Sequence, residues 1–362
     1  MSLLLLYNKY HAAYAGEEKR VETGGDVTFL ETLLQAEIPT KIKVYHYDER
    51  GDDAGVIQGE SLELKNYKYH LTMNEELLMW LAINKPDVIV FWPTGIPNID
   101  PTRILMSVIK RELHIPLILV IGDSVTPWSK SFIDSWLPFV NYVAIEDDIV
   151  DEARYDQRYI QFNLSTGTNK KIFYDHGLKK DIDVSFIGNT KVANRMMYLD
   201  YLKTSGIDVY VSGGTKKTEL SWDEYATLLS RSKITLNFCL NDKYPQIKGR
   251  VMEAMACNTM LIEDEGTVTN QLFEEGKDFI MVKSKEDMLE KIQYYLAHDS
   301  EREAIAASGH KKQQEFYTAK NIWNYLFKKA KIEFSECTVL NFSHDFFYKM
   351  ESIWNENRNL LK

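Results

Sequence analysis

Two cations and a carboxylate lie close together in the stretch KGRVMEAMACNTMLIED, residues 248–264. Lys248 and Arg250 precede or open a predicted short helix, where free backbone N–H groups and the helix dipole attract anions. Glu253 follows one turn later, where its carboxylate can accept hydrogen bonds from sugar or ribose hydroxyls. Asn258 is predicted to end the helix in a left-handed conformation, since Asn is the usual substitute for Gly at such a cap. The two cations and the carboxylate suit a diphosphate site, although an ordinary surface helix with a solvated charge pair explains them equally well.

A second pair of cations flanks a strand-to-helix turn earlier in the chain. Gly188 ends a predicted strand, and Lys191 and Arg195 lie in the turn and at the start of the helix that follows. Such a turn is the other natural place for a diphosphate. Gly213 lies in the corresponding turn after the next predicted strand. The two cationic helix starts together predict an anion site between them.

The first half of the chain offers one candidate general base. Asp123 follows a predicted buried strand, where a carboxylate can take a proton or bind a substrate hydroxyl, although capping of the next turn is the favoured alternative. Asp26 is predicted to cap a helix over residues 27–36. His46 is isolated from other candidate residues in the sequence, so we expect it to have a structural or solvent-facing role. Further rim residues expected at the ends of strands are Thr94, Gly95, Ser124 and Glu146.

The elements that must position these residues alternate between strands and helices. A doubly wound parallel sheet is typical of this pattern, and its ligands lie outside the carboxyl ends of the strands. The polar stretch 151–180 is the best candidate for a linker between two such units. The predicted strands cover residues 3–7, 41–47, 88–92, 116–121, 141–145, 184–187, 207–211, 233–240, 259–262 and 279–282.

Composition excludes several classes of protein. The 362 residues suit two domains, and no apolar run is long enough to span a membrane. The first ten residues lack the basic leader of a signal peptide, and three cysteines without metal spacing favour free thiols in a reducing cytoplasm. A net charge of −10 disfavours nucleic acid as the main partner. We therefore expect a cytoplasmic protein without a metal site.

Three segments of the second half carry a family resemblance. DVSFIGNTKVANRMMYLDYL, KGRVMEAMACNTMLIED and LFEEGKDFIMVKSKEDMLEKIQYYLAHDSEREAIAASGHKK together resemble the C-terminal domain of GT-B glycosyltransferases, with the CgeB-like (spore-maturation-type) enzymes as the nearest match. The resemblance covers residues 181–325.

The resemblance implies two facing Rossmann-like domains with a central cleft and a C-terminal helix that crosses back to the first domain. The implied ranges are 1–165 with a returning helix at about 340–362, and 166–339. A nucleotide-diphosphate sugar, UDP- or GDP-linked, would bind mainly to the second domain without a metal, and a hydroxyl-bearing acceptor to the first. Lys191, Arg195, Lys248 and Arg250 would face the diphosphate and Glu253 the ribose.

One position departs from the family pattern. Related enzymes carry a second glutamate, which holds the transferred sugar, where this chain has Pro245. Two alternatives to a glycosyltransferase therefore stay open. One is a nucleotide-sugar-binding module that lost its chemistry, and the other is an epimerase of the same fold.

Overall fold

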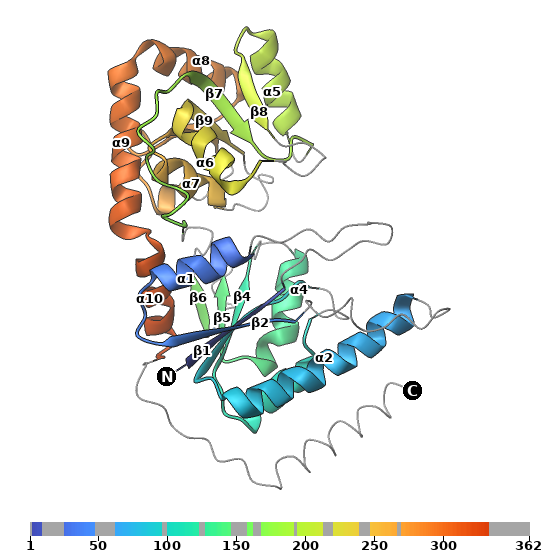
Figure 1. Cartoon of the computed structure of the whole chain (residues 1–362). Coiled ribbons are helices and arrows are strands. Elements are labelled where there is room, and N and C mark those ends of the chain that lie inside the picture. Colours follow the sequence, from blue (N-terminus) through green and yellow to red (C-terminus); the bar gives the residue numbers. More distant parts are fainter. Residues whose placement is uncertain are drawn as a thin grey trace.

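A computed structural model of the chain describes eleven segments. They are residues 2–8, 25–47, 62–95, 100–122, 127–145, 158–161, 168–191, 194–212, 220–238, 247–265 and 269–332. These residues form two α/β units, which lie one above the other in Figure 1. Each unit is built on its own parallel sheet.

The first sheet has six parallel strands in the order β2-β1-β3-β4-β5-β6. Its central strands are short, continuous apolar runs, as expected for strands covered on both faces. This arrangement confirms the predicted doubly wound sheet. The strands are β1 (Ser2–Tyr7), β2 (Lys41–His46), β3 (Val88–Trp92), β4 (Leu117–Ile121), β5 (Tyr142–Ile145) and β6 (Tyr159–Gln161).

Helices cover both faces of the first sheet. One face packs against α2 (Leu62–Asn84), α3 (Arg103–Arg111) and α4 (Pro127–Trp136), whose apolar side chains share a core with alternate residues of the strands. The other face packs against a π-helical turn (Asp26–Leu30), the α1 helix that continues it (Glu31–Gln35), and α10 (Ala319–Lys329). The sequence predicts a helix over residues 74–84, and the observed α2 begins earlier, at Leu62; α4 was not predicted.

The second sheet has five parallel strands in the order β11-β10-β9-β7-β8. One face is covered by α6 and α7, and the other by α5, α8 and α9. The strands are β7 (Ile182–Ile187), β8 (Val209–Ser212), β9 (Ser232–Asn237), β10 (Met260–Asp264) and β11 (Ile280–Val282). The helices are α5 (Arg195–Thr204), α6 (Trp222–Arg231), α7 (Gly249–Ala256), α8 (Lys285–Ala297) and α9 (Asp299–Phe316).

The chain returns from the second unit to the first through α10. Trp323 on this helix is fully buried in the first core, and its indole Nε1 donates to Thr32 Oγ1 at 3.1 Å. In Figure 1, α9 runs along the second unit and α10 lies against the first. The predicted second domain, 166–339, therefore includes a helix that belongs to the first core. The segment 340–362, for which the crossing was predicted, lies outside the described residues.

Asp26 does not cap its helix as predicted. Gly25 before it already has helical backbone angles (φ −57°, ψ −32°), and no side chain caps this helix start. The Asp26 carboxylate instead accepts a hydrogen bond from the hydroxyl of Tyr7 at the end of β1. The N-cap prediction was wrong because the Asp26 side chain bonds to Tyr7, a residue distant in the sequence, and not to the start of its own helix.

Two further observations concern the described residues alone. None of their helices combines the length and the apolarity that crossing a bilayer requires. Cys257, the cysteine that lies within them, is buried and free, and burial raises the pKa of its thiol to about 12. Such a thiol is chemically inert at neutral pH.

Candidate functional site

Both sheets reverse their strand order at one place. In the second sheet, β7 pairs with β8 on one side and with β9 on the other. The helices that follow β7 and β9 therefore leave on opposite faces, which opens a space at the carboxyl ends of these two strands. Ligands of doubly wound sheets bind at such a reversal. The candidate diphosphate residues lie there.

Gly188 directly follows β7 at this reversal. Its φ of 152° is a backbone conformation that residues with side chains rarely adopt, and its N–H donates to Ser212 O at 2.9 Å. A Cβ built on Gly188 would come within 2.4 Å of Arg250 Nη2. Glycine is therefore needed here because the guanidinium of Arg250 lies against the backbone.

Arg250 is the cation that the fold holds most firmly at this place. It is the second residue of α7, and its Nη1 donates to Asn237 Oδ1 at 2.6 Å. Asn237 ends β9 and in turn donates through Nδ2 to Glu263 Oε1 at 2.6 Å. The guanidinium also lies 5.1 Å from the ring centroid of Phe186, within cation–π range. Three strands thus fix one guanidinium at their carboxyl ends.

Arg195 lies beside Arg250 but directs its donors to the backbone. It is 6% exposed, and its two terminal nitrogens donate to Asn189 O at 2.8 Å and Phe238 O at 3.3 Å. These bonds join the turn after β7 to the end of β9. The geometry therefore suits a residue that holds the two sides of the site together, and its predicted contact with a diphosphate stays a prediction.

The two lysines occupy more open positions. Lys248 is the N-cap residue of α7 and is partly exposed, and its side chain makes no capping hydrogen bond. Lys191 is exposed, and its backbone N–H donates to Asn189 Oδ1 at 2.9 Å. Along the chain, Lys191 lies close to Gly188, and Lys248 lies close to Arg250. Gly213 lies outside the described residues, as do Asp123 and Pro245.

Glu253 lies one turn after Arg250 on the same helix. Its Oε2 accepts a hydrogen bond from the hydroxyl of Tyr225 on α6. Burial raises the pKa of the Glu253 carboxyl, against the hydrogen bond from Tyr225 and the charge of Arg250. Burial also raises the pKa of Tyr225 well above its ordinary value. The Tyr225 hydroxyl thus fixes the orientation of the Glu253 side chain.

The end of α7 confirms a second prediction from the sequence. Asn258 has a φ of 54°, the left-handed conformation predicted for it. The Thr259 N–H donates to Ala254 O and the Asn258 N–H to Met255 O, each at 3.0 Å, which is the Schellman pattern of helix termination. The chain therefore turns sharply into β10.

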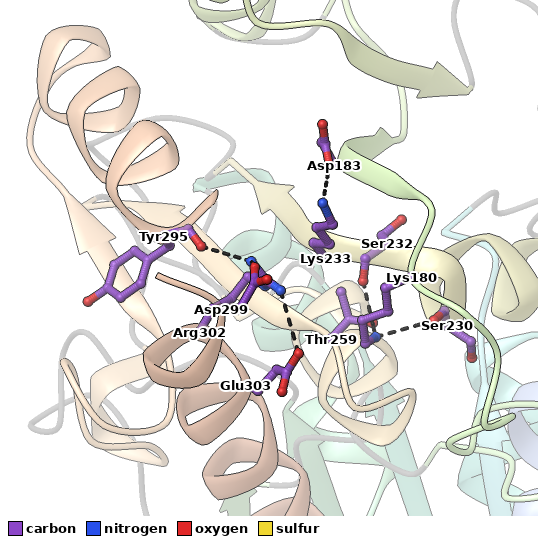
Figure 2. Close-up of polar contacts among 10 residues, drawn as sticks. All are labelled: Lys180, Asp183, Ser230, Ser232, Lys233, Thr259, Tyr295, Asp299, Arg302 and Glu303. Carbon is purple, nitrogen blue, oxygen red and sulfur yellow. Dashed lines mark hydrogen bonds and ion pairs between the residues drawn. The ribbon is translucent and has the colours of Figure 1, made fainter. Parts of the chain in front are cut away.

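Figure 2 shows polar residues at the opposite edge of the second sheet. Lys180 Nζ donates to the carbonyl oxygens of Ser230 and Ser232 at 3.2 and 3.1 Å, and to Thr259 Oγ1 at 3.3 Å. Burial of the ammonium lowers its pKa. Since Ser232 begins β9 and Thr259 directly precedes β10, Lys180 joins the amino ends of these strands. Its role is structural, away from the candidate site.

The rim of the first sheet has one strongly perturbed carboxyl group. Asp100 is buried and accepts hydrogen bonds from the Thr94 N–H and hydroxyl at 2.7 Å and from the Gly95 N–H at 2.9 Å. The Tyr47 hydroxyl lies 3.2 Å from the same carboxylate. Burial raises the pKa of Asp100 to about 6. Asp100 therefore shapes the loop after β3.

Sequence reasoning missed the residues that orient the charged side chains of the site. Asn237 had a visible signal, because a single amide interrupts the apolar strand KITLNFCL. Phe186 and Tyr225 had none, since aromatic residues in a strand and on a helix are ordinary core residues. Among the described residues no three histidine, cysteine or acidic side chains gather as a metal site would require.

Comparisons with known proteins relate the chain to glycosyltransferases. Residues 191–328 match a family described as glycosyl transferase-like. A search of curated proteins by sequence found no match. The matched residues include both cationic helix starts, and they confirm the resemblance of the second half to glycosyltransferases.

Solved structures match nearly the whole chain. BGT of phage T4, in complex with UDP-glucose, is 12% identical with a TM-score of 0.58, over 91% of this chain and 99% of that one. HepE of Anabaena, in complex with UDP, is 10% identical with a TM-score of 0.55, over 91% and 100%. Sucrose-phosphate synthase of Thermosynechococcus elongatus is 14% identical with a TM-score of 0.56, over 91% and 98%. The chain thus has the GT-B fold.

Proposed function

We propose that this protein is a glycosyltransferase that moves a hexose from a UDP-sugar to a hydroxyl-bearing acceptor. The observation that carries the proposal is Arg250, fixed by Asn237 against the backbone of Gly188 where the second sheet reverses its strand order. UDP and the hexose are chosen because the T4 and Anabaena structures of the same fold hold UDP-glucose or UDP.

Transfer of a sugar requires charge stabilisation on the leaving diphosphate. As the bond between the anomeric carbon and the diphosphate lengthens, negative charge grows on the phosphate oxygens. The Arg250 guanidinium, the partly exposed Lys248 and the N–H groups at the start of α7 offset that charge. Because Arg250 is already oriented by Asn237, it needs no reorganisation during the reaction.

The remaining predicted contacts complete the donor site. Glu253, held by Tyr225, would accept the ribose hydroxyls, and Lys191 would reach the diphosphate from the turn after β7. Metal-independent transfer is part of this proposal, since side-chain cations supply the positive charge, although one structure of the T4 enzyme holds UDP and Mn²⁺. Activity that survives chelation with EDTA would support that part.

The acceptor is proposed to bind to the first unit. A β-glucosyltransferase of the same fold is described as a DNA-modifying enzyme. This chain has a net charge of −10, so we propose a glycan, lipid, protein or small molecule rather than duplex DNA. The sequence predicted Asp123 as a candidate general base, and that residue lies outside the described residues.

A thermal-shift panel of nucleotides and nucleotide sugars tests the proposal. A ligand that binds only the folded protein raises its melting temperature, so the donor should stabilise the chain while unrelated nucleotides do not. Arg250→Ala should lower donor turnover by about 10²–10³, the usual cost of a removed transition-state donor. Saturable binding without turnover would favour the binding-module alternative, and a converted nucleotide sugar without transfer would favour the epimerase.

A further inference from the structure

Three side chains meet at the carboxyl edge of the first sheet, where its strand order also reverses. Tyr7 ends β1 and His46 ends β2, while Asp26 begins the helical segment after β1. Strand β1 pairs with β2 on one side and with β3 on the other, so Tyr7 and Asp26 border the β1/β3 reversal at which a doubly wound sheet binds its ligand, and His46 lies beside them at the end of β2. The chain thus brings a carboxylate, an imidazole and a phenol to one point.

The Tyr7 hydroxyl and the His46 imidazole both contact one oxygen of the Asp26 carboxylate. The Tyr7 hydroxyl donates to Asp26 Oδ1, and His46 Nε2 lies 3.3 Å from the same oxygen. The rings of Tyr7 and His46 meet edge to face with centroids 4.6 Å apart. Among the described residues Asp26 Oδ2 has no hydrogen-bond or ion-pair partner, and the Asp26 side chain is 44% exposed. One oxygen is therefore anchored and the other is open.

The cluster begins the segment that contacts the second unit. One helical turn after Asp26, Glu31 accepts a hydrogen bond from Asn169 Nδ2 at 2.6 Å, and Gln35 donates to Asn169 Oδ1 at 2.5 Å. Figure 1 shows α1 on the side of the first sheet that faces the second unit. An open carboxylate at this edge is placed to meet a molecule held between the first sheet and the donor.

We propose that Asp26 is the catalytic base that binds and deprotonates the acceptor hydroxyl, and that Tyr7 and His46 position it. This inference rests on the proposed function. The acceptor proton moves to Asp26 Oδ2 while the acceptor oxygen bonds to the anomeric carbon of the donor sugar. The bond from that carbon to the diphosphate breaks, its electron pair leaves on the diphosphate, and Asp26 later releases the proton to water. Such a displacement inverts the anomeric configuration.

Hydrolysis of UDP-glucose, with water as the acceptor, tests the base without knowledge of the natural acceptor. Asp26→Asn keeps the shape of the side chain and removes the basic oxygen, so UDP release should fall by about 10²–10⁴, the range for a lost general base. The thermal shift produced by UDP should be unchanged, because the donor residues are intact. Glu37→Gln is the matched control, an exposed carboxylate just before β2 at the opposite edge of the sheet, and it should retain the wild-type rate.

Two further measurements separate the base from its supports. Tyr7→Phe removes the hydroxyl that donates to Oδ1, and it should lower kcat while leaving the KM for UDP-glucose unchanged. Proton NMR of the glucose released by the wild-type protein should show the β-anomer first.

The following results would overturn the inference. A wild-type rate for Asp26→Asn with intact UDP binding would leave the glycosyltransferase proposal standing and exclude Asp26 as the base. Loss of turnover in Asp123→Asn alone would place the base there, and release of α-glucose would exclude a displacement assisted by a base. Failure of the wild-type protein to bind or turn over UDP-glucose would refute the donor assignment as well.

Discussion

Gly188→Ala is the sharpest test of the donor site, because the substitution acts on the site through a single contact. The new Cβ would lie 2.4 Å from Arg250 Nη2 and 3.4 Å from Arg250 Cζ and from the ring of Phe186. The closest atom is the end of a flexible side chain, so the guanidinium should swing away and break its bond to Asn237. The backbone of the site itself should stay in place.

The magnitude follows from what the guanidinium contributes. A charge-assisted hydrogen bond contributes about 1.5–3 kcal/mol, which corresponds to UDP binding weaker by about 10- to 150-fold. Turnover should fall further, by about 10²–10³, if Arg250 stabilises the leaving diphosphate. Forcing a side chain onto a φ of 152° costs about 1–3 kcal/mol of folding free energy in addition.

Gly206→Ala separates the backbone strain from the displaced cation. Gly206 has a φ of 85° and lies in the same unit, yet a Cβ there meets no atom within 4 Å. Both variants should therefore melt several degrees lower, while only Gly188→Ala loses UDP affinity, measured by calorimetric titration. Wild-type UDP affinity in Gly188→Ala would show that Arg250 does not contact the diphosphate.

Two other predictions concern the first unit. Trp323→Ala should reduce the free energy of unfolding in urea by about 3–5 kcal/mol, because it empties a fully buried site. Tyr325 is exposed on the same helix, so Tyr325→Ala should reduce this free energy only slightly. Equal losses in the two variants would contradict the packing of α10. Asp100 has a pKa raised to about 6, so its contribution to stability is fully present below pH 3.8 and is lost as pH rises through 6. Relative to Asp100→Asn, the wild type should therefore gain about 1 kcal/mol of unfolding free energy between pH 7 and pH 5, and no gain would show that Asp100 is ionised throughout.

The strands of both sheets except β6 were predictable because buried parallel strands are short apolar runs, whereas β6 lies in the polar stretch 151–180 that was predicted to be a linker. Val88–Trp92 appears with its predicted bounds, and Gly188 directly follows β7, as predicted. The end of α7 was also predictable, since Asn258 is one of the few residues that tolerate a left-handed backbone. Local chemistry decides each of these features, so a single sequence is enough.

Features that depend on distant segments were not predictable. Asp26 looked like a helix cap, and only the pairing of β1 with β2 brings Tyr7 and His46 to its carboxylate. Asn237 at the end of β9 orients Arg250 on α7. The apolar pattern of α10 does not indicate which of the two cores the helix packs into. Spacing in sequence carries no information about such contacts.

The position of Trp323 also determines the order in which the two units can be completed during synthesis. The first sheet ends at Gln161, but its core is closed only when α10 leaves the ribosome, after the whole of the second unit has emerged. The second sheet, with all five of its strands and α5 to α9, ends at Phe316 and can therefore finish folding first. A nascent or truncated chain that stops before α10 exposes the apolar face that Phe29 and Leu33 line. The unit that is made first is thus the one whose core closes last, and its exposed apolar face is open to aggregation until then.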